Sequence, residues 1–99
     1  MKYHIQIMEP ALEHLDELRA SDRKTILEAV EASLVHEPSL PAKNRKPMRP
    51  NKLATWELRI GSFRVYYDVV VEPEPTVVVV AVGLKEGAKV LIAGEKIQL

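Results

Sequence analysis

The segment from Trp56 to Tyr67 constrains the fold more than any other part of this 99-residue chain. Gly61-Ser62 at its centre suits a two-residue type II′ turn, in which glycine takes the first position. Such a turn fixes an antiparallel register, and partners directly across the two strands share one face of the sheet. The predicted pairs are Ile60–Phe63, Arg59–Arg64, Leu58–Val65, Glu57–Tyr66 and Trp56–Tyr67.

This register separates the side chains of the hairpin by polarity. One face receives only apolar or aromatic residues, and the other receives Glu57, Arg59, Arg64 and Tyr66. A slip of one residue would destroy the separation, so the pattern itself supports the predicted register. We expect the apolar face to pack against helices and the polar face to be open to solvent.

The flanking segments predict an α+β domain of order βααβββ, with two N-terminal helices packed on one face of a mostly antiparallel sheet. A strand over residues 3–8 is followed by helices over about 10–19 and 22–35, where apolar residues recur at helical spacing. A proline-broken loop over residues 38–54 precedes strands over 55–60, 63–71 and 76–82. Five valines in the last strand indicate burial on both faces. For the tail we favour a hairpin over residues 89–99 and keep a short helix as the alternative.

Composition fits one ordinary globular domain over residues 1–99. Apolar residues make up 46% of the chain and charged residues 28%, which argues against disorder. There is no cysteine, so thiolate metal sites and thiol nucleophiles are excluded. The longest apolar run, Val77–Val82, is far shorter than the roughly 20 residues of a membrane helix, and the N-terminus lacks the apolar stretch of a signal peptide. We therefore expect a cytoplasmic protein that does not enter a membrane.

The formal net charge is zero, but the charges are unevenly distributed along the chain. Residues 43–64 hold seven of the fourteen Lys and Arg residues and one acid, whereas residues 1–42 and 65–99 are net negative. Such a concentration of positive charge indicates a polyanion or an acidic partner. The loop part supplies five cations that we predict to contact RNA, namely Lys43, Arg45, Lys46, Arg49 and Lys52. An acidic protein segment and bulk solvent are the alternatives.

Two arginines, Arg59 and Arg64, are predicted to face each other across the hairpin. Like charges in this position repel unless an anion lies between them, and guanidinium groups bind phosphate in bidentate fashion. The pair therefore predicts an anion site, and the alternative is that Glu57 neutralises Arg64 from the diagonal position. Histidines and carboxylates show no metal-binding spacing, so we expect neither a metal nor another cofactor.

The hairpin and the strand after it resemble the RelE/ParE superfamily, the toxins of bacterial and archaeal type II toxin–antitoxin modules. The pattern L-R-I-G-x-[FY]-R-V-x-Y at Leu58–Tyr67 carries this likeness, together with a valine-rich strand that ends at Val82-Gly83. Element order extends it over nearly the whole chain. The resemblance implies a small cytoplasmic toxin that a cognate antitoxin holds inactive.

Members of this superfamily differ in their targets. RelE-like toxins cut mRNA in the ribosomal A site without a metal, ParE-like toxins poison DNA gyrase, and some relatives are inert. The resemblance makes an mRNA interferase, a ribosome-dependent endoribonuclease that inhibits translation, the first expectation for this chain. A gyrase poison and a module that only binds its antitoxin are the alternatives.

Comparison with the RelE pattern, position by position, gives a mixed set of site residues. Arg64 falls on the hairpin arginine that stabilises the transition state, and Lys85 falls near an arginine of the fourth strand. Leu91 stands where RelE-like enzymes have a tyrosine, and their pair of lysines on the second strand is not reproduced.

A substitute catalytic set would use the polar face of the hairpin. Under this hypothesis Glu57 is the base for the ribose 2′-hydroxyl, and Arg59 and Arg64 clamp the phosphate. Tyr66 would orient the ribose or donate a proton.

Overall fold

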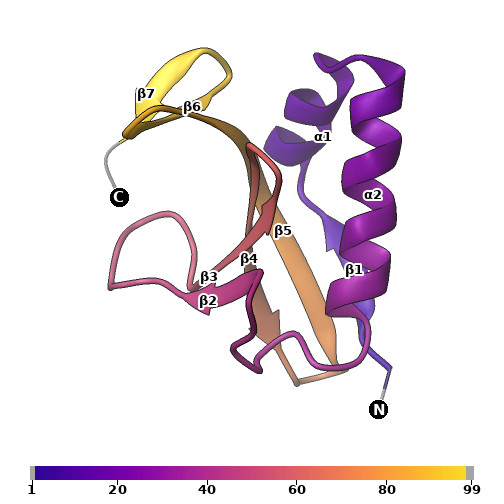
Figure 1. Cartoon of the computed structure of the whole chain (residues 1–99). Coiled ribbons are helices and arrows are strands. Elements are labelled where there is room, and N and C mark those ends of the chain that lie inside the picture. The colour runs from indigo at the N-terminus through magenta and orange to yellow at the C-terminus, as the bar shows by residue number, and fades with distance from the viewer. Residues whose placement is uncertain (1, 98–99) are drawn as a thin grey trace.

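The computed structural model describes residues 2–97, and the predicted α+β class is confirmed. Two helices pack on one face of a curved, mostly antiparallel sheet (Figure 1). The elements are β1 (His4–Ile7), α1 (Glu9–Asp16), α2 (Ala20–Leu34), β2 (Arg45–Pro47), β3 (Trp56–Ile60), β4 (Phe63–Val70), β5 (Thr76–Glu86), β6 (Lys89–Ile92) and β7 (Glu95–Ile97). Neither helix has the length and apolar character that crossing a membrane requires, as far as the described residues go.

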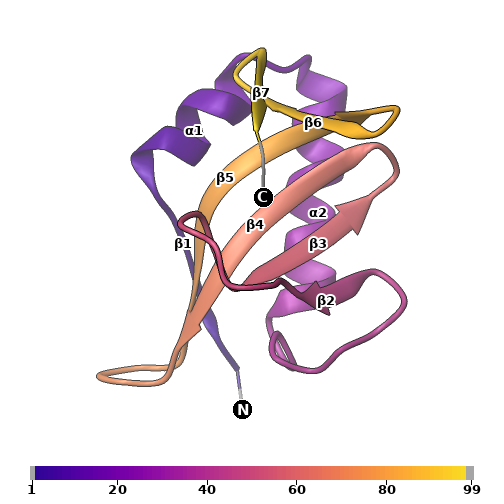
Figure 2. The ribbon, with the colours of Figure 1, turned by 90° about the vertical axis from the view of Figure 1, so that its left-hand side faces the viewer.

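The strands follow the order β2-β3-β4-β5-β6-β7 across the sheet. β1 lies off this path and runs parallel to the first residues of β5, whereas β6 pairs with the last residues of β5. Figure 2 shows β4 and β5 at the centre, with the helices behind them. This central position explains the valine run of β5, because its side chains join apolar clusters on both faces of the sheet.

All five predicted pairs of the β3–β4 hairpin are confirmed. Gly61 has a φ of +57°, a value that glycine adopts without the steric cost of a side chain. Leu58, Val65 and Tyr67 are fully buried in a cluster with apolar residues of both helices, and Trp56 stacks on Tyr67 with ring centroids 6.2 Å apart. The apolar face of the hairpin therefore packs against the helices, as the alternation of side chains predicts.

The opposite face of the sheet is partly covered, which contradicts the expectation that the polar face of the hairpin is open. We call this side of the sheet the concave face, because the sheet curves around it (Figure 1). A second apolar cluster lies there, in which Ala54, Tyr66, Ala81 and Ile92 are buried and Met48, Leu53, Val80, Val90 and Ile97 pack against them. The segment 48–54 and the β6–β7 hairpin supply most of this cover. Both are too short to show the apolar periodicity from which a covering layer is predicted.

Two features of β5 accompany its curvature toward β6. Val80 has no partner on β4 and forms a β-bulge beside the Tyr66–Ala81 pair, and bulges bend a strand. Further along, the chain of β6 folds closely over Gly83. A Cβ atom at this position would lie 3.0 Å from the carbonyl oxygen of Leu91. Glycine therefore allows the β6–β7 hairpin to close over the concave face.

Several element boundaries differ from the prediction. The irregular segment 38–54 contains the short strand β2, the strand predicted over 76–82 continues to Glu86, and α1 ends at Asp16. The favoured C-terminal hairpin is confirmed within residues 89–97, and the rest of the predicted strand lies outside the described residues. Its turn has positive φ at both Ala93 (54°) and Gly94 (80°), as a type I′ turn requires.

Helix α1 is joined to the edge of β5 by backbone and side-chain hydrogen bonds. The N–H of Met8 donates to the Val79 carbonyl at 2.9 Å, and the N–H of Val82 donates to Nδ1 of His14 at 3.2 Å. β1 pairs with β5 only up to Val79, and β6 pairs with β5 only from Leu84 onward. His14 therefore contacts the part of β5 between Val79 and Leu84, which neither strand pairs. The sequence pattern gave no reason to expect this role for a histidine.

Candidate functional site

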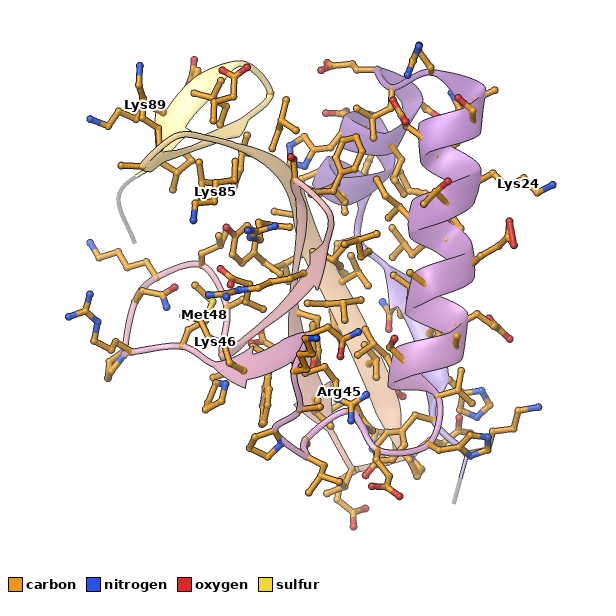
Figure 3. All side chains as sticks on the ribbon, in the orientation of Figure 1. Lys24, Arg45, Lys46, Met48, Lys85 and Lys89 are labelled. Carbon is orange, nitrogen blue, oxygen red and sulfur yellow. The ribbon has the colours of Figure 1, made fainter. Side chains whose placement is uncertain are left out.

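The register of the sheet places all five predicted catalytic residues on the concave face. Glu57 lies opposite Tyr66, and Arg59 lies opposite Arg64. Arg64 is paired with the β5 residue two positions before Lys85, and residues two apart on a strand share a face. Figure 3 shows Lys85 on the side of the sheet away from α2. The predicted shared face of Glu57, Arg59, Arg64 and Tyr66 is therefore confirmed, and Lys85 joins it without having been predicted there.

Burial divides the five residues into two groups. Glu57 is 8% exposed, Arg64 is 7% exposed and Tyr66 is inaccessible, whereas Arg59 and Lys85 are exposed. The expected open polar face is thus wrong for three of the four residues predicted to lie on it. The physical reason is the second apolar cluster, which covers the middle of the concave face and includes the ring of Tyr66 itself.

The charged groups of the hairpin already have partners within the chain. Nε of Arg59 lies 2.9 Å from Oε1 of Glu57, so Glu57 neutralises Arg59. The alternative prediction, in which Glu57 neutralises Arg64, is therefore wrong. Nη1 of Arg64 donates to the carbonyl oxygens of Gly61 (2.8 Å) and Phe63 (2.9 Å) and so closes the turn of its own hairpin. Each arginine thus has a partner within the chain, and the predicted anion site between them stays a prediction.

Tyr66 carries a hydroxyl that is buried without a hydrogen-bond partner among the described residues. Burial, and after it the nearby Glu57 carboxylate, raise the pKa of this hydroxyl to about 12, against the opposing effect of Arg64 and Arg59. The phenol therefore keeps its proton at neutral pH. Such a group can donate a proton or a hydrogen bond, but it cannot act as a base there.

The position where the RelE pattern has a tyrosine lies on the other face of the sheet. Leu91 of β6 borders a small cavity of about 190 Å³ that it shares with His14 and Phe63. The β6 residues that face the concave side are Val90 and Ile92, and both join the second apolar cluster. A tyrosine at position 91 would therefore point away from Glu57 and Lys85.

The five predicted loop cations differ in their surroundings. Lys43, Lys46, Arg49 and Lys52 are exposed. Arg45 instead donates from Nη1 to the Ser33 carbonyl of α2 at 2.7 Å and from Nε to the Leu40 carbonyl at 3.0 Å. Its guanidinium ties the loop to the helix layer, because the register turns Arg45 toward α2 and Lys46 toward the concave face.

Asn51 orders the segment that covers the concave face, although it is not among the residues predicted from the sequence. Its Oδ1 accepts hydrogen bonds from the N–H groups of Leu53 and Ala54, and its Nδ2 donates to the carbonyls of Arg49 and Ala54. Asparagine stabilises turns in this way. The Pro50-Asn51 dipeptide is a turn signal that could have identified it.

A cleft of about 320 Å³ separates the loop after β2 from the C-terminal hairpin. Its walls are the residues Lys46, Pro47, Met48, Arg49, Asn51, Glu57, Ala88, Val90 and Ile97. In Figure 3 the side chains of Lys46 and Met48 lie on the same side of the sheet as Lys85.

A wider hollow of about 650 Å³ follows the outer surface of α2, remote from these polar groups. Within residues 2–97, acidic and histidine side chains form no group of three suited to a metal ion.

Comparison with known proteins points to one family. A family model described as the ParE toxin of the type II toxin–antitoxin system, parDE, matches residues 5–87. One chain in the crystal structure of the toxin–antitoxin complex RelBE2 from Mycobacterium tuberculosis is similar, with a TM-score of 0.73 and 25% sequence identity over 86% of this chain and 100% of that chain. No curated protein matches the chain. The family match includes both helices and β2–β5 and ends before β6.

Proposed function

The chain belongs to the ParE toxin family of type II toxin–antitoxin systems, and from that premise we propose that it poisons a protein target, DNA gyrase, without cutting RNA. The observation that carries this proposal is the state of the residues that RNA cleavage would use. The only carboxylate of the predicted catalytic set, Glu57, is buried and paired with Arg59. A general base must reach the proton that it removes, and the small exposure of Glu57, together with the hold of Arg59 on its Oε1, disfavours that role.

The other members of the set support the same proposal. Arg64 is engaged by two carbonyls of its own turn, and the Tyr66 hydroxyl is enclosed. Lys85 and Arg59 are the exposed cations, but two cations without a base do not complete the acid–base chemistry of ribose attack. Poisoning by binding requires no such chemistry.

Ribosome-dependent RNA cleavage is the second candidate, and one observation favours it. The register gathers Glu57, Arg59, Arg64, Tyr66 and Lys85 on a single face, which is the arrangement that a catalytic site needs. For cleavage to occur, the loop 48–54 or the β6–β7 hairpin would move on contact with the ribosome and release Glu57.

The two candidates are separated by inducing the toxin in cells and following both targets. We expect plasmid DNA to become relaxed or cleaved, no new RNA 5′ ends in phase with codons, and inhibition of purified gyrase in a supercoiling assay. Glu57→Gln should leave the gyrase effect intact in preparations that retain the native melting profile. Codon-phased RNA cuts that disappear in Glu57→Gln would contradict the proposal and support the nuclease.

A further inference from the structure

The cleft on the concave face combines an apolar floor with a cationic rim. Pro47, Met48, Ala88, Val90 and Ile97 supply apolar surface from two segments that lie far apart in the sequence. Among these, Met48, Val90 and Ile97 belong to the second apolar cluster, so the floor is continuous with a packed core. Such a surface binds an apolar side chain, because insertion removes apolar area from water on both partners.

The rim of this cleft is positively charged. Lys46 and Arg49 line the cleft and are exposed, and Lys85 pairs with the cleft residue Val90 and projects on the same face (Figure 3). The single acid in the lining, Glu57, already neutralises Arg59 at 2.9 Å. The net field over the cleft is therefore positive and complements a negatively charged ligand.

We infer that this cleft is the docking site for an acidic segment of the antitoxin, which inserts an apolar side chain between Met48 and Val90 while its carboxylates reach Lys46, Arg49 and Lys85. This inference rests on the assignment of the chain as a type II toxin, whose partner is an antitoxin. It adds which surface is used and by what chemistry. It does not depend on whether the cellular target is gyrase or RNA.

The lining favours an acidic peptide over a nucleic acid. Single-stranded nucleic acids bind through stacking of bases on aromatic side chains as well as through cations. The part of the chain that the structure describes places no aromatic residue in the wall of this cleft. Tyr66 is enclosed below it, and Trp56 and Tyr67 face the helices. An apolar floor without a stacking surface matches a peptide side chain.

The outer hollow along α2 is the competing surface. It is wider, but Lys24 and Arg23 there are interspersed with Glu28 and Glu31, so it has no charge bias toward an acidic partner. Lys24 provides a matched control, since it is an exposed lysine on the opposite side of the molecule from Lys46 and Lys85 (Figure 3).

The test uses the whole toxin and the antitoxin encoded beside its gene, purified separately and recombined. We expect the double variant Lys46→Glu/Lys85→Glu to bind at least about tenfold more weakly, with a slower association rate that is less sensitive to salt. Lys24→Glu should bind like the parent. Met48→Ala, which keeps every charge, should weaken binding through faster dissociation.

Hydrogen exchange of the complex locates the surface independently of these variants. Protection of backbone amides confined to residues 46–53 and 88–97 would support the inference. Protection confined to α1 and α2, or loss of binding in Lys24→Glu and not in the double variant, would overturn it. Competition by a single-stranded RNA of about 16 nucleotides, the upper end of typical site sizes, at affinity equal to that of the antitoxin would assign the cleft to nucleic acid instead. The supercoiling assay of gyrase uses the toxin without its antitoxin and is independent of these binding results. An incorrect docking surface can therefore be distinguished from an incorrect cellular target.

Discussion

Nδ1 of His14 accepts a hydrogen bond from the backbone N–H of Val82. Val82 has no partner on either β1 or β6. We predict that His14→Ala lowers the free energy of unfolding by about 1–3 kcal/mol, because a buried donor loses its acceptor. His14→Asn should cost less, since the asparagine oxygen can take a place close to that of Nδ1. Urea unfolding followed by Trp56 fluorescence measures both variants, and equal losses would show that packing and not the hydrogen bond matters.

Tyr66 makes stability depend on alkaline pH. Burial raises the pKa of its hydroxyl from 10.0 to about 12 in the folded protein. Above pH 10 the unfolded chain loses this proton before the folded chain does, so the stabilisation present below pH 10 is lost as the pH rises toward 12. At about 1.4 kcal/mol per pKa unit, the loss is roughly 2–3 kcal/mol.

Tyr66→Phe is expected to remove this contribution and to leave stability at neutral pH unchanged or slightly higher, because the hydroxyl that it removes has no partner. Chemical unfolding at pH 8 and at pH 11 measures the difference. Tyr67 is the comparison, because burial also raises its pKa but its hydroxyl donates to the Pro38 carbonyl at 2.7 Å. Tyr67→Phe should therefore be destabilising at neutral pH. Tyr67 also contributes to the alkaline loss, so the assignment predicts a smaller loss between pH 8 and pH 11 in Tyr66→Phe than in the parent, and an equal loss in both would contradict it.

At the scale of elements, the close packing of β6 on β5 requires a residue without a side chain at position 83. We predict that Gly83→Ala destabilises the protein by about 1–3 kcal/mol, because the new Cβ would contact the Leu91 carbonyl oxygen and force the β6–β7 hairpin outward. Gly87→Ala is the control. Its Cβ would meet open space and only the strain of a positive φ, 63°, remains. Amide exchange in β6 should accelerate in Gly83→Ala and stay near the parent rate in Gly87→Ala.

The β3–β4 hairpin could be read from the sequence because its signal is local. A glycine turn fixed the register, and strict alternation over ten residues assigned each side chain to a face. The cover of the concave face could not be read in this way. It depends on residues about forty positions apart, such as Met48 and Val90, that pack against the same buried cluster from segments whose own patterns are too short to predict packing.

The same distinction explains the site. Sequence placed Glu57, Arg59, Arg64 and Tyr66 on one face, which strand periodicity determines. It did not predict which of them solvent can reach, because exposure is set by the loop and hairpin above them. The partner of Glu57 was likewise misassigned, since the ion pair forms along β3 and not diagonally across to β4.

At the scale of the whole molecule, one sheet supports two separate apolar clusters. We predict that deleting residues 88–99 uncovers the smaller cluster and leaves the helix-side cluster folded. Loss of Ile92 and its neighbours should cost about 2–4 kcal/mol, at 1.5–3 kcal/mol for each fully buried side chain. Circular dichroism should retain the helical signal, while the urea midpoint falls and the dye ANS binds. Complete unfolding would show that the two clusters form one cooperative unit.

The attachment of Arg45 to the Ser33 carbonyl has a consequence for diversification within such toxins. The arginine ties β2, the strand that leads into the 48–54 segment, to the helical side of the molecule, so this segment starts from a fixed base. Under the docking inference, substitutions at the tip of the segment can then alter antitoxin binding without disturbing the scaffold that displays it. New specificities can arise on one side of the sheet while the packing of the other side stays unchanged.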